Sequence, residues 1–478
     1  MTTNWFDDSH PAMLEEKLEN GMVKCHLSPR NCVIAEGRRG FCGVRANKDG
    51  NLVTLNYGKS VHATVETIET EAIFHYAPGD RILSMGNIGC MLNCDYCQNW
   101  KTSQARMVNN ENVFRYTPQD VVDMALRHNI RVISWTYNDP VVWHEFVIDT
   151  ARLAQQHGIK NLYKSAFFIT PEAIEQLIPV IDIFSISIKS MDPDYYKKLT
   201  KGWIQPVLDG AIQAYKSGKH VELSTLMVTD ISDNEETARA LTNFVLENMG
   251  PEVPIHFVRF HPDYKMINTT RTPIPRLEQA RKVAKEMGMK HVYLGNVYDN
   301  DAVNTYCAGC EQLQVTRYGL NAQLVGIDAE GNCTKCAKPA GFKVFQEPAK
   351  PRQSVDVLPA DAQLTNASYM WEGDIKALHV QVRNDTPETQ MIYTRRVGDA
   401  TVPTEWSIIP LLPAESHRFI AAKSLPEEQG VEVAIPAGIH SSLHQVFDRA
   451  HFPTTAVGEG TLNADATPLP AFKGVGLS

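Results

Sequence analysis

The sequence lacks the features of a membrane protein or a nucleic-acid-binding protein. No apolar run in its 478 residues approaches the roughly 20 residues that a membrane span requires. Basic residues do not exceed acidic ones (46 against 55), so the net charge of -9 supplies no general basic field for a nucleic acid. The N-terminus is polar and acidic, without the basic start and apolar stretch of a signal peptide. We therefore expect a cytoplasmic protein whose partners include neither a membrane nor a nucleic acid.

Cysteine is absent from residue 337 to the end, although ten cysteines precede that point. They form three groups: Cys25, Cys32 and Cys42; Cys90, Cys94 and Cys97; and Cys307, Cys310, Cys333 and Cys336. Cytoplasmic thiols stay reduced, and reduced cysteines at short spacings are more typical of metal binding than of disulfides. The change in cysteine usage near residue 337 also indicates a domain boundary.

Residues 81–300 alternate between strand-like and helix-like segments. Apolar, strand-like runs occupy 81–89, 130–137, 160–168, 182–189, 220–228, 254–262 and 291–297. Helical periodicity occupies 117–129, 140–158, 171–180, 206–218, 235–250 and 274–288. Repeating βα units with continuous apolar strands predict an α/β fold in which helices cover a parallel sheet. Periodicity alone does not decide between an open sheet and a full or partial barrel.

Several residues mark helix ends in this region. Thr117 and Thr170, each followed by proline, fit the N-cap and first helical positions. Gly158, Gly218 and Gly288 fit the position that follows a helix. These residues predict where five of the helices begin or end.

The regions on either side of this alternation are richer in strand signals. Residues 51–69 contain short runs of β-branched and aromatic residues. Residues 347–359 read as a proline-rich linker. Short strand-like stretches then follow at 375–385, 390–397, 405–413, 417–424 and 431–438. They predict a C-terminal β-sandwich-like domain of roughly 100 residues.

The central cysteine group carries the chemistry. Cys90, Cys94 and Cys97 lie within eight residues, directly after a predicted strand. Such a loop supplies one thiolate to each of three irons, so a [4Fe–4S] cluster held there keeps its fourth iron open to an outside ligand. Two alternatives are a zinc site that takes a fourth ligand from elsewhere and three purely structural thiols.

The spacing Cys-x3-Cys-x2-Cys, with Tyr96 before the last cysteine, resembles the signature of the radical S-adenosylmethionine (SAM) enzymes. In that superfamily the open iron binds SAM, and reductive cleavage releases a 5′-deoxyadenosyl radical that abstracts hydrogen from a substrate. The resemblance implies a [4Fe–4S] cluster and SAM as cofactors. It also implies an electron donor such as flavodoxin or ferredoxin, because the cluster must be reduced.

Further stretches resemble one subgroup of that superfamily. They are CQNW at 97–100 and the segments 134–145, 185–202, 256–266 and 293–299. They resemble the radical SAM enzyme of the AmmeMemoRadiSam system, which is related to pyruvate formate-lyase activating enzymes. The resemblance covers about residues 24–340. It implies a partial (β/α)6 TIM-like barrel and suggests Memo-like and AMMECR-like proteins as partners, by association alone.

The predicted organisation has four parts. They are an N-terminal cysteine-containing β-rich region at 1–80, a radical SAM core barrel at 81–300, a zinc-ribbon-like segment at 301–345 and a C-terminal β-rich domain at 346–478. The last part has strand edges and no cysteines, so it is either a docking surface or a shield for the barrel mouth.

The resemblance also assigns cofactor-binding residues. Tyr137, Asn138 and Asp139 stand where activating enzymes contact the SAM amino group. Ser187 and Lys189 stand where those enzymes carry an Asp-x-Lys that reaches SAM; Ser187 departs from the aspartate, and Lys189 has the alternative of a solvated strand end. Glu222 and Thr225 are expected to face the barrel interior, and Asn296 to approach the adenine or ribose.

Two residues at the end of a predicted strand are candidate catalytic groups. Arg259 is placed to hold an anionic substrate or the SAM carboxylate, and His261 to hold or protonate the substrate. The alternative for His261 is a structural histidine at a strand end.

The four cysteines near residue 320 form two short turns. Cys307 and Cys310 are separated from Cys333 and Cys336 by 22 residues with a strand-like pattern. Two such turns complete a closed tetrahedral four-thiolate site, which favours structural zinc. A rubredoxin-type iron site and a second iron–sulfur cluster are the alternatives.

The N-terminal group has three cysteines, and many relatives carry a fourth where this chain has Ser28. Cys25, Cys32 and Cys42 either bind zinc together with His26 or are simply buried thiols; we favour the second.

The sequence therefore predicts a radical SAM enzyme whose substrate is a small molecule or a glycyl-radical-type protein. The rival is a non-catalytic metal-binding scaffold or adaptor protein with a zinc ribbon. The intact central cysteine group disfavours that rival.

Overall fold

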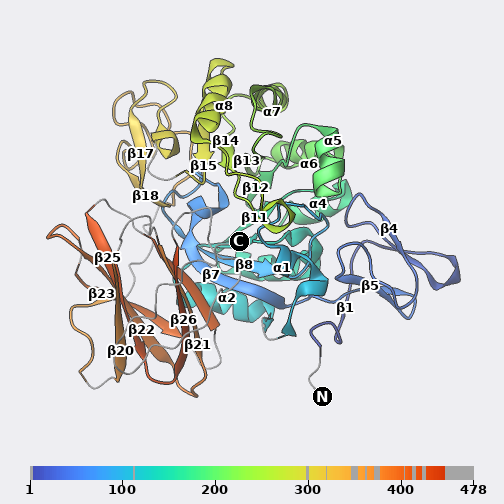
Figure 1. Ribbon diagram of the computed structural model, residues 1–478, viewed down its shortest axis with the longest axis horizontal. Coiled ribbons are helices and arrows are strands. Elements are labelled where there is room, and N and C mark those ends of the chain that lie inside the picture. Colours follow the sequence, from blue (N-terminus) through green and yellow to red (C-terminus); the bar gives the residue numbers. More distant parts are fainter. Residues whose placement is uncertain are drawn as a thin grey trace.

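The computed structural model describes residues 4–110, 113–297, 301–318, 320–345, 354–360, 363–370, 377–402, 404–411, 416–422 and 427–446. Figure 1 shows a central α/β region flanked by the N-terminal strands β1, β4 and β5, the small sheet with β17 and β18, and the C-terminal strands β20–β26. No helix of these described ranges is long and apolar enough to span a membrane.

The central region is built on parallel strands, as the sequence predicts. They are β8 (Arg81–Asn87), β10 (Val132–Thr136), β11 (Lys160–Ser165), β12 (Ile183–Ser187), β13 (His220–Met227), β14 (Ile255–Arg259) and β15 (Val292–Gly295). Each pairs in parallel with the next in this order. Their side chains are almost entirely buried, which explains the continuous apolar runs in the sequence. The predicted α/β fold is confirmed.

Helices connect these strands. They are α2 (Pro118–Arg127), α3 (His144–Gln156), α4 (Pro171–Leu177), α6 (Gln205–Lys216), α7 (Glu235–Asn248) and α8 (Ile274–Glu286). Thr117 caps α2 in a reciprocal capping box with Asp120. Thr170 occupies the N-cap position of α4, but its hydroxyl donates to the carbonyl of His26 at 2.7 Å instead of capping the helix. The three predicted glycines each follow a helix with positive φ.

The sheet curls around the short helix η2 (Ile68–Glu71). Ser84 of β8 and Ser134 of β10 donate to the Glu71 carboxylate at 3.2 and 2.9 Å. Ser185 of β12 donates to the Glu71 carbonyl at 2.6 Å. Because three strands reach one residue, the sheet is strongly curved. It stays open, since β15 pairs with β14 alone along the sheet path.

The N-terminal region is continuous with this sheet. Strand β7 (Lys59–Thr67) pairs antiparallel with β8 and also with the short β9 (Phe114–Arg115). Two small sheets precede it: β1 (His10–Pro11), β6 (Asn51–Thr54) and β5 (Arg45–Lys48); and β2 (Glu15–Lys17), β3 (Val23–Cys25) and β4 (Cys32–Ile34). The strand pattern predicted for 51–69 is confirmed.

The C-terminal strands form a five-stranded sheet and a three-stranded extension of the central sheet. The first contains β19 (Ser354–Val355), β23 (Trp406–Leu411), β22 (Gln390–Gly398), β25 (Glu428–Pro436) and β20 (Leu364–Met370). The second contains β24 (Ser416–Ala422), β21 (Ala377–Asn384) and β26 (Ile439–Val446). Val380 of β21 packs in one apolar cluster with Ile409 and Val433 of the larger sheet, so the two sheets share a core. Most of the predicted linker, 347–353, lies outside the described residues.

Strand β24 joins the C-terminal part to the rest of the molecule. It pairs in parallel with β7, with Arg418 opposite Thr64 and Phe419 opposite Val65. The central sheet therefore runs without a break from β15 to β26. This pairing covers the edge of β7 that β8 leaves open.

Candidate functional site

The cysteine loop leaves the end of β8 and leads into the short helix α1 (Trp100–Ser103). Gly89 begins the loop with φ +92°, and a Cβ there would lie 2.9 Å from the side chain of Val44. The peptide N–H groups of Asn93 and Asp95 donate to the carbonyls of Thr200 and Leu199 at 3.0 and 2.9 Å. The loop is thus fixed by backbone contacts to a distant segment.

Asp95 adds two ion pairs to this anchoring. Its carboxylate lies 2.9 Å from the ammonium groups of both Lys201 and Lys265. Lys265 also donates its backbone N–H to the Asp95 carbonyl at 3.0 Å. The loop is therefore tied to the segments that follow β12 and β14.

Cys90, Cys94 and Cys97 are half-buried in this loop. Burial raises the pKa of all three thiols, to about 12 for Cys94, where the charge of Lys189 acts in the opposite direction. Cys97 Sγ lies 3.3 Å from the hydroxyl of Ser103. Among the described residues, the three sulfur atoms do not all fall within 4.8 Å of one another, as ligands of a single ion would.

The aromatic residue of the motif has a packing role. Tyr96 is buried in a cluster with Tyr195, Val228 and Phe260, and Cys94 packs against that cluster. The Tyr96 and Tyr195 ring centroids lie 6.2 Å apart. The ring thus closes one side of the cysteine loop.

The turn after β10 places Tyr137 and Asn138 beside the cysteine loop. Tyr137 has a left-handed φ of 64°, and its carbonyl accepts a hydrogen bond from Asn99 Nδ2. Asn138 accepts from Thr102 Oγ1 at 3.1 Å and donates to the carbonyl of Asn87. The structure therefore brings this predicted SAM-binding turn to the cysteine loop.

Asp139 joins the ends of two strands. Its carboxylate accepts from Ser165 Oγ at 2.8 Å and from the backbone N–H of Ala166 at 2.7 Å. It also accepts from the N–H of Val141 at 3.2 Å at the start of the next helical turn. These bonds hold the side chain of Asp139 in place; its predicted SAM role stays a prediction.

Lys189 and Ser187 lie near the same loop. The positive charge of Lys189 acts on both Cys94 and Asp139. Ser187 Oγ lies 2.9 Å from Ser224 Oγ on the neighbouring strand. Both remain half-buried, and their roles toward SAM stay predictions.

Glu222 faces the sheet interior, as expected. Its carboxylate accepts from the N–H groups of Phe74 and His75 at 2.7–3.0 Å. His220 and His256 lie 2.9 and 2.7 Å from its oxygens. These partners belong to the segment after η2, to the start of β13 and to β14, and none of them belongs to the cysteine loop.

The expectation that Thr225 also faces the interior is wrong. Successive side chains of a strand point to opposite faces, and β13 pairs without irregularity with β12 and β14. Thr225 therefore points away from the interior that Glu222 and Ser224 share.

Arg259 and Asn296 come together at the ends of β14 and β15. Asn296 Nδ2 donates to the Arg259 carbonyl at 3.1 Å, and Arg259 Nε donates to the Thr272 carbonyl at 2.9 Å. Both side chains are half-buried, as is His261. The catalytic roles predicted for Arg259 and His261, and the adenine or ribose contact of Asn296, stay predictions.

Sequence reasoning missed several residues of this site. Asn99 and Asn87 fix the turn after β10, and Lys164 projects from the middle of a buried strand. Lys164 could have been found from the sequence, because it is a charged residue inside the apolar run 160–168. Nothing in the sequence pairs Asn99 with Tyr137.

Cys307, Cys310, Cys333 and Cys336 converge beside the small sheet of β16 (Thr305–Tyr306), β17 (Leu313–Tyr318) and β18 (Asn321–Leu324). Their four sulfur atoms all lie within 4.8 Å of one another. The Cys307–Cys336 and Cys310–Cys333 sulfur pairs are each 3.6 Å apart. Four thiolates at about 2.3 Å around a tetrahedral ion would lie about 3.8 Å apart, so this geometry fits a metal. The predicted convergence of the four cysteines is confirmed.

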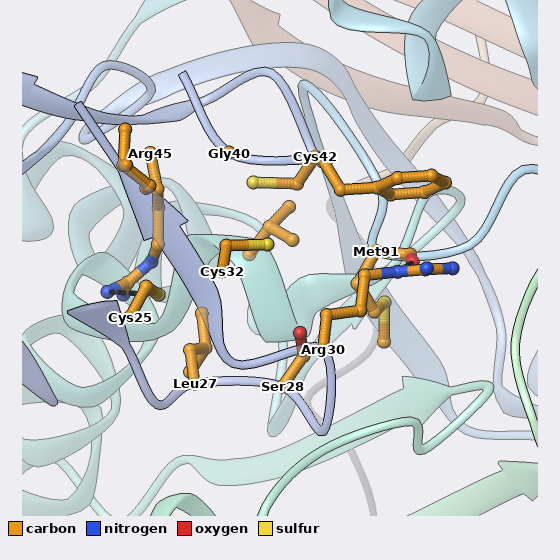
Figure 2. Close-up of a pocket in the computed structure, with 12 residues that line it drawn as sticks. Cys25, Leu27, Ser28, Arg30, Cys32, Gly40, Cys42, Arg45 and Met91 are labelled. Atoms are coloured by element: carbon orange, nitrogen blue, oxygen red, sulfur yellow. Dashed lines mark hydrogen bonds between the residues drawn. The ribbon is translucent and has the colours of Figure 1, made fainter. Parts of the chain in front are cut away.

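Cys25, Cys32 and Cys42 line one small cavity of about 20 Å³. In Figure 2 the Cys32 and Cys42 sulfurs point into it, whereas Cys25 lies beside Arg45, whose Nη1 is 3.9 Å from its sulfur. Among the described residues, these three thiols do not share the close spacing of the four-cysteine group. Both His26 ring nitrogens contact other residues, Glu16 and Asn31. The arrangement gives no support to His26 as a fourth ligand.

Comparison with known proteins places the chain in a family. Residues 87–245 match the radical SAM superfamily. An uncharacterized protein of Methanocaldococcus jannaschii is 40% identical over 334 residues, covering 70% of this chain and 98% of that protein. The pyruvate formate-lyase 1-activating enzyme of Escherichia coli (strain K12) is 21% identical over 236 residues, covering 45% of this chain and 93% of that enzyme.

Solved structures are similar over smaller parts. A domain of a pyruvate formate-lyase-activating enzyme from Bacteroides vulgatus gives a TM-score of 0.30 at 15% identity, covering 34% of this chain and 97% of that chain. Streptococcus suis SuiB bound to S-adenosylmethionine gives a TM-score of 0.35 at 13% identity, covering 43% of this chain and 48% of that chain. Because the superfamily match spans the cysteine loop and the archaeal relative is similar over nearly its whole length, the chain belongs to the radical SAM superfamily and is a radical SAM enzyme.

Proposed function

We propose that this enzyme reductively cleaves SAM at a [4Fe–4S] cluster held by Cys90, Cys94 and Cys97, and that the cleavage starts hydrogen abstraction from a substrate. The observation that carries the proposal is the single loop that presents three thiols directly after β8, inside the region that matches the superfamily. When bound, the cluster supplies the electron, and SAM supplies the 5′-deoxyadenosyl radical.

The donor set fits such a cluster. Three thiolates, each on a different iron, leave the fourth iron without a protein ligand. Their pKa values are raised by burial, so loading the cluster must release protons from the thiols.

The residues around the loop orient and shield this centre. Asn99 holds the turn at Tyr137 against the loop, and Lys189 places a positive charge beside Cys94. Trp100 stacks on Tyr264 with ring centroids 5.2 Å apart, which covers the loop with apolar surface. Such packing limits the access of water to a reactive centre.

The biological setting is also a proposal. The resemblance to the AmmeMemoRadiSam enzyme supports Memo-like and AMMECR-like partners, a flavodoxin or ferredoxin as electron donor, and a cytoplasmic location. The substrate class stays open between a small molecule and a glycyl-radical-type protein, the second supported by the similarity to enzymes named as activating enzymes.

We propose further that Cys307, Cys310, Cys333 and Cys336 hold a structural zinc ion. The support is the convergence of four cysteine sulfurs, with 3.6 Å within each close pair, because four thiolates in tetrahedral geometry are typical of structural zinc. In this arrangement the ion holds the turns around the small sheet of β16–β18 together.

Anaerobic reconstitution tests the cluster assignment. The wild-type protein should bind about four irons per chain and give a reduced-cluster electron paramagnetic resonance signal that SAM alters. Cys94→Ala should lose both properties, whereas Cys42→Ala, a matched change in the N-terminal cavity, should keep them. A colourless wild-type protein that binds only zinc would instead support the non-catalytic scaffold.

A further inference from the structure

Lys164 lies on the interior face of the curved sheet. It is on β11, and the strand register aligns it with Ser185 of β12, which in turn aligns with Glu222 of β13. Lys164 Nζ donates to Ser185 Oγ at 3.0 Å and to Ser224 Oγ at 3.4 Å. Hydroxyl groups of two neighbouring strands therefore hold this ammonium group.

Lys164 makes no ion pair among the described residues. Among acidic groups, Glu71 raises the pKa of Lys164 the most, and its oxygens already accept from Ser84, Ser134 and Thr136 at 2.8–3.2 Å. A lysine that served only to neutralise Glu71 would contact that carboxylate directly. Instead, its hydrogen-bonding capacity is directed to the serines, and an ammonium group has three donors for its partners.

The polar groups around Lys164 differ in exposure. Lys164, Ser187 and Lys189 are half-buried, whereas Ser185 and Ser224 between them are almost fully buried. Ser187 Oγ lies 2.9 Å from Ser224 Oγ, so the hydroxyls form a chain from Lys164 toward Lys189. Lys189 in turn acts electrostatically on Cys94. A series of polar groups thus leads from Lys164 to the lysine whose charge acts on Cys94.

We propose that Lys164, with Ser187 and Ser224, forms a subsite inside the curved sheet for an oxyanion group of the substrate, a carboxylate or a phosphate. The assignment rests on the proposed function, because a substrate held there would present its remaining atoms toward the cysteine loop. A lysine ammonium is a point charge that binds either kind of oxyanion, and hydroxyl groups complete such a site as donors. The buried surroundings strengthen the attraction relative to water.

Reductive labelling with glyoxylate tests the subsite on the reconstituted protein. The nitrogen of Lys164 attacks the aldehyde carbon, water leaves, and cyanoborohydride adds hydride to the iminium carbon to give a carboxymethyl-lysine. Peptide mapping compares Lys164 with Lys160, a half-buried lysine of the same strand that pairs with Asp182 at 3.2 Å. Burial lowers the pKa of Lys164 to about 8, which leaves more free amine for the reaction.

We expect labelling of Lys164 to be at least about tenfold faster than that of Lys160. Inorganic phosphate or acetate should suppress it several-fold, while chloride at equal ionic strength should not. The more effective of the two competitors identifies the preferred oxyanion. In the Ser224→Ala protein, phosphate or acetate should suppress the labelling of Lys164 less than in the wild-type protein.

Two results would overturn the assignment. The first is labelling of Lys164 that neither phosphate nor acetate suppresses. The second is labelling of Lys164 that only SAM abolishes, which would mean that Lys164 binds SAM and not the substrate. No step of the labelling needs SAM cleavage. If the protein cleaves SAM but fails the labelling test, only the subsite assignment is wrong. If the protein passes the labelling test without cleaving SAM, only the proposed function is wrong.

Discussion

Arg45 and Glu145 form an ion pair with side chains only 1% and 2% exposed. Arg45 belongs to β5 of the N-terminal region, and Glu145 to helix α3 of the central region. Glu145 also accepts from the backbone N–H of Met13 at 2.7 Å, and Arg45 donates to the Met13 carbonyl at 2.9 Å. The pair therefore locks the N-terminal strands onto the helical layer, next to the cavity lined by the N-terminal cysteines.

Replacing Glu145 with glutamine should destabilise the protein by about 3–5 kcal/mol, because the Arg45 charge stays buried without its partner. Urea unfolding of the apo-protein measures the change. Glu175→Gln, an exposed position on α4, is the matched control and should change stability by less than about 0.5 kcal/mol. Equal stabilities for the two variants would show that the pair does not hold the regions together.

The same pair predicts a pH dependence. Burial raises the pKa of Glu145, but the charges of Arg45 and His144 and the backbone N–H donors together lower it by more, so the pKa is below its ordinary value of 4.5. The stability from this group is present above pH 4.5 and is lost as the pH falls through the lowered pKa. Wild-type urea midpoints should therefore fall more steeply below pH 4.5 than those of Glu145→Gln. If the urea midpoints of the two proteins fall equally with pH, Glu145 is not the source of the pH dependence.

Local sequence patterns predicted the central sheet because its signals are local. The strand runs are apolar since both sheet faces are covered, and Thr117 and Gly158 mark helix ends through bonds within a few residues. The three-cysteine loop was recognised for the same reason, since its spacing lies within eight residues.

Contacts between distant segments were not predictable in this way. Arg45 and Glu145 are 100 residues apart, and β24 meets β7 across more than 350 residues of sequence. The expectation for Thr225 was wrong because Glu222 and Thr225 are three residues apart on one strand, and alternation places such residues on opposite faces. The contact of Thr170 was not predictable for the same reason, because its hydroxyl donates to the carbonyl of the distant His26 and does not cap its own helix.

Asp139→Ala should weaken the turn that faces the cysteine loop. The change removes the acceptor for Ser165 and for the N–H groups of Ala166 and Val141, which should lower stability by about 1–3 kcal/mol. SAM affinity, measured by equilibrium binding to the reconstituted protein, should fall ~10-fold, about 1.4 kcal/mol. The exposed Asp209→Ala is the control. Unchanged SAM affinity in Asp139→Ala would show that the turn does not position SAM.

Cys310→Ser should release the ion of the four-cysteine group. A closed structural site contributes its binding energy to folding, so zinc content should fall from about one per chain and the Tm should drop. Cys32→Ser, in the N-terminal cavity, should leave zinc content unchanged. Zinc retained at wild-type level in Cys310→Ser would refute the site.

Removing residues 347–478 should expose the edge of β7 that β24 covers. An unpaired strand edge invites pairing with other chains, so the truncated protein should self-associate in sedimentation velocity and melt at a lower temperature. Deleting only 451–478 leaves every described strand in place and serves as the control. A monomeric truncated protein with the wild-type Tm would show that the C-terminal part is a detachable module.

The most direct test of the account is SAM cleavage itself. Reconstituted wild-type protein with dithionite and SAM under anaerobic conditions should yield 5′-deoxyadenosine and methionine in equal amounts, detected by chromatography and mass spectrometry. Cys94→Ala should yield neither, while keeping the wild-type circular dichroism spectrum. 5′-Deoxyadenosine formed equally by Cys94→Ala, or by neither protein despite a full iron content, would contradict the assignment of the cluster and its reaction.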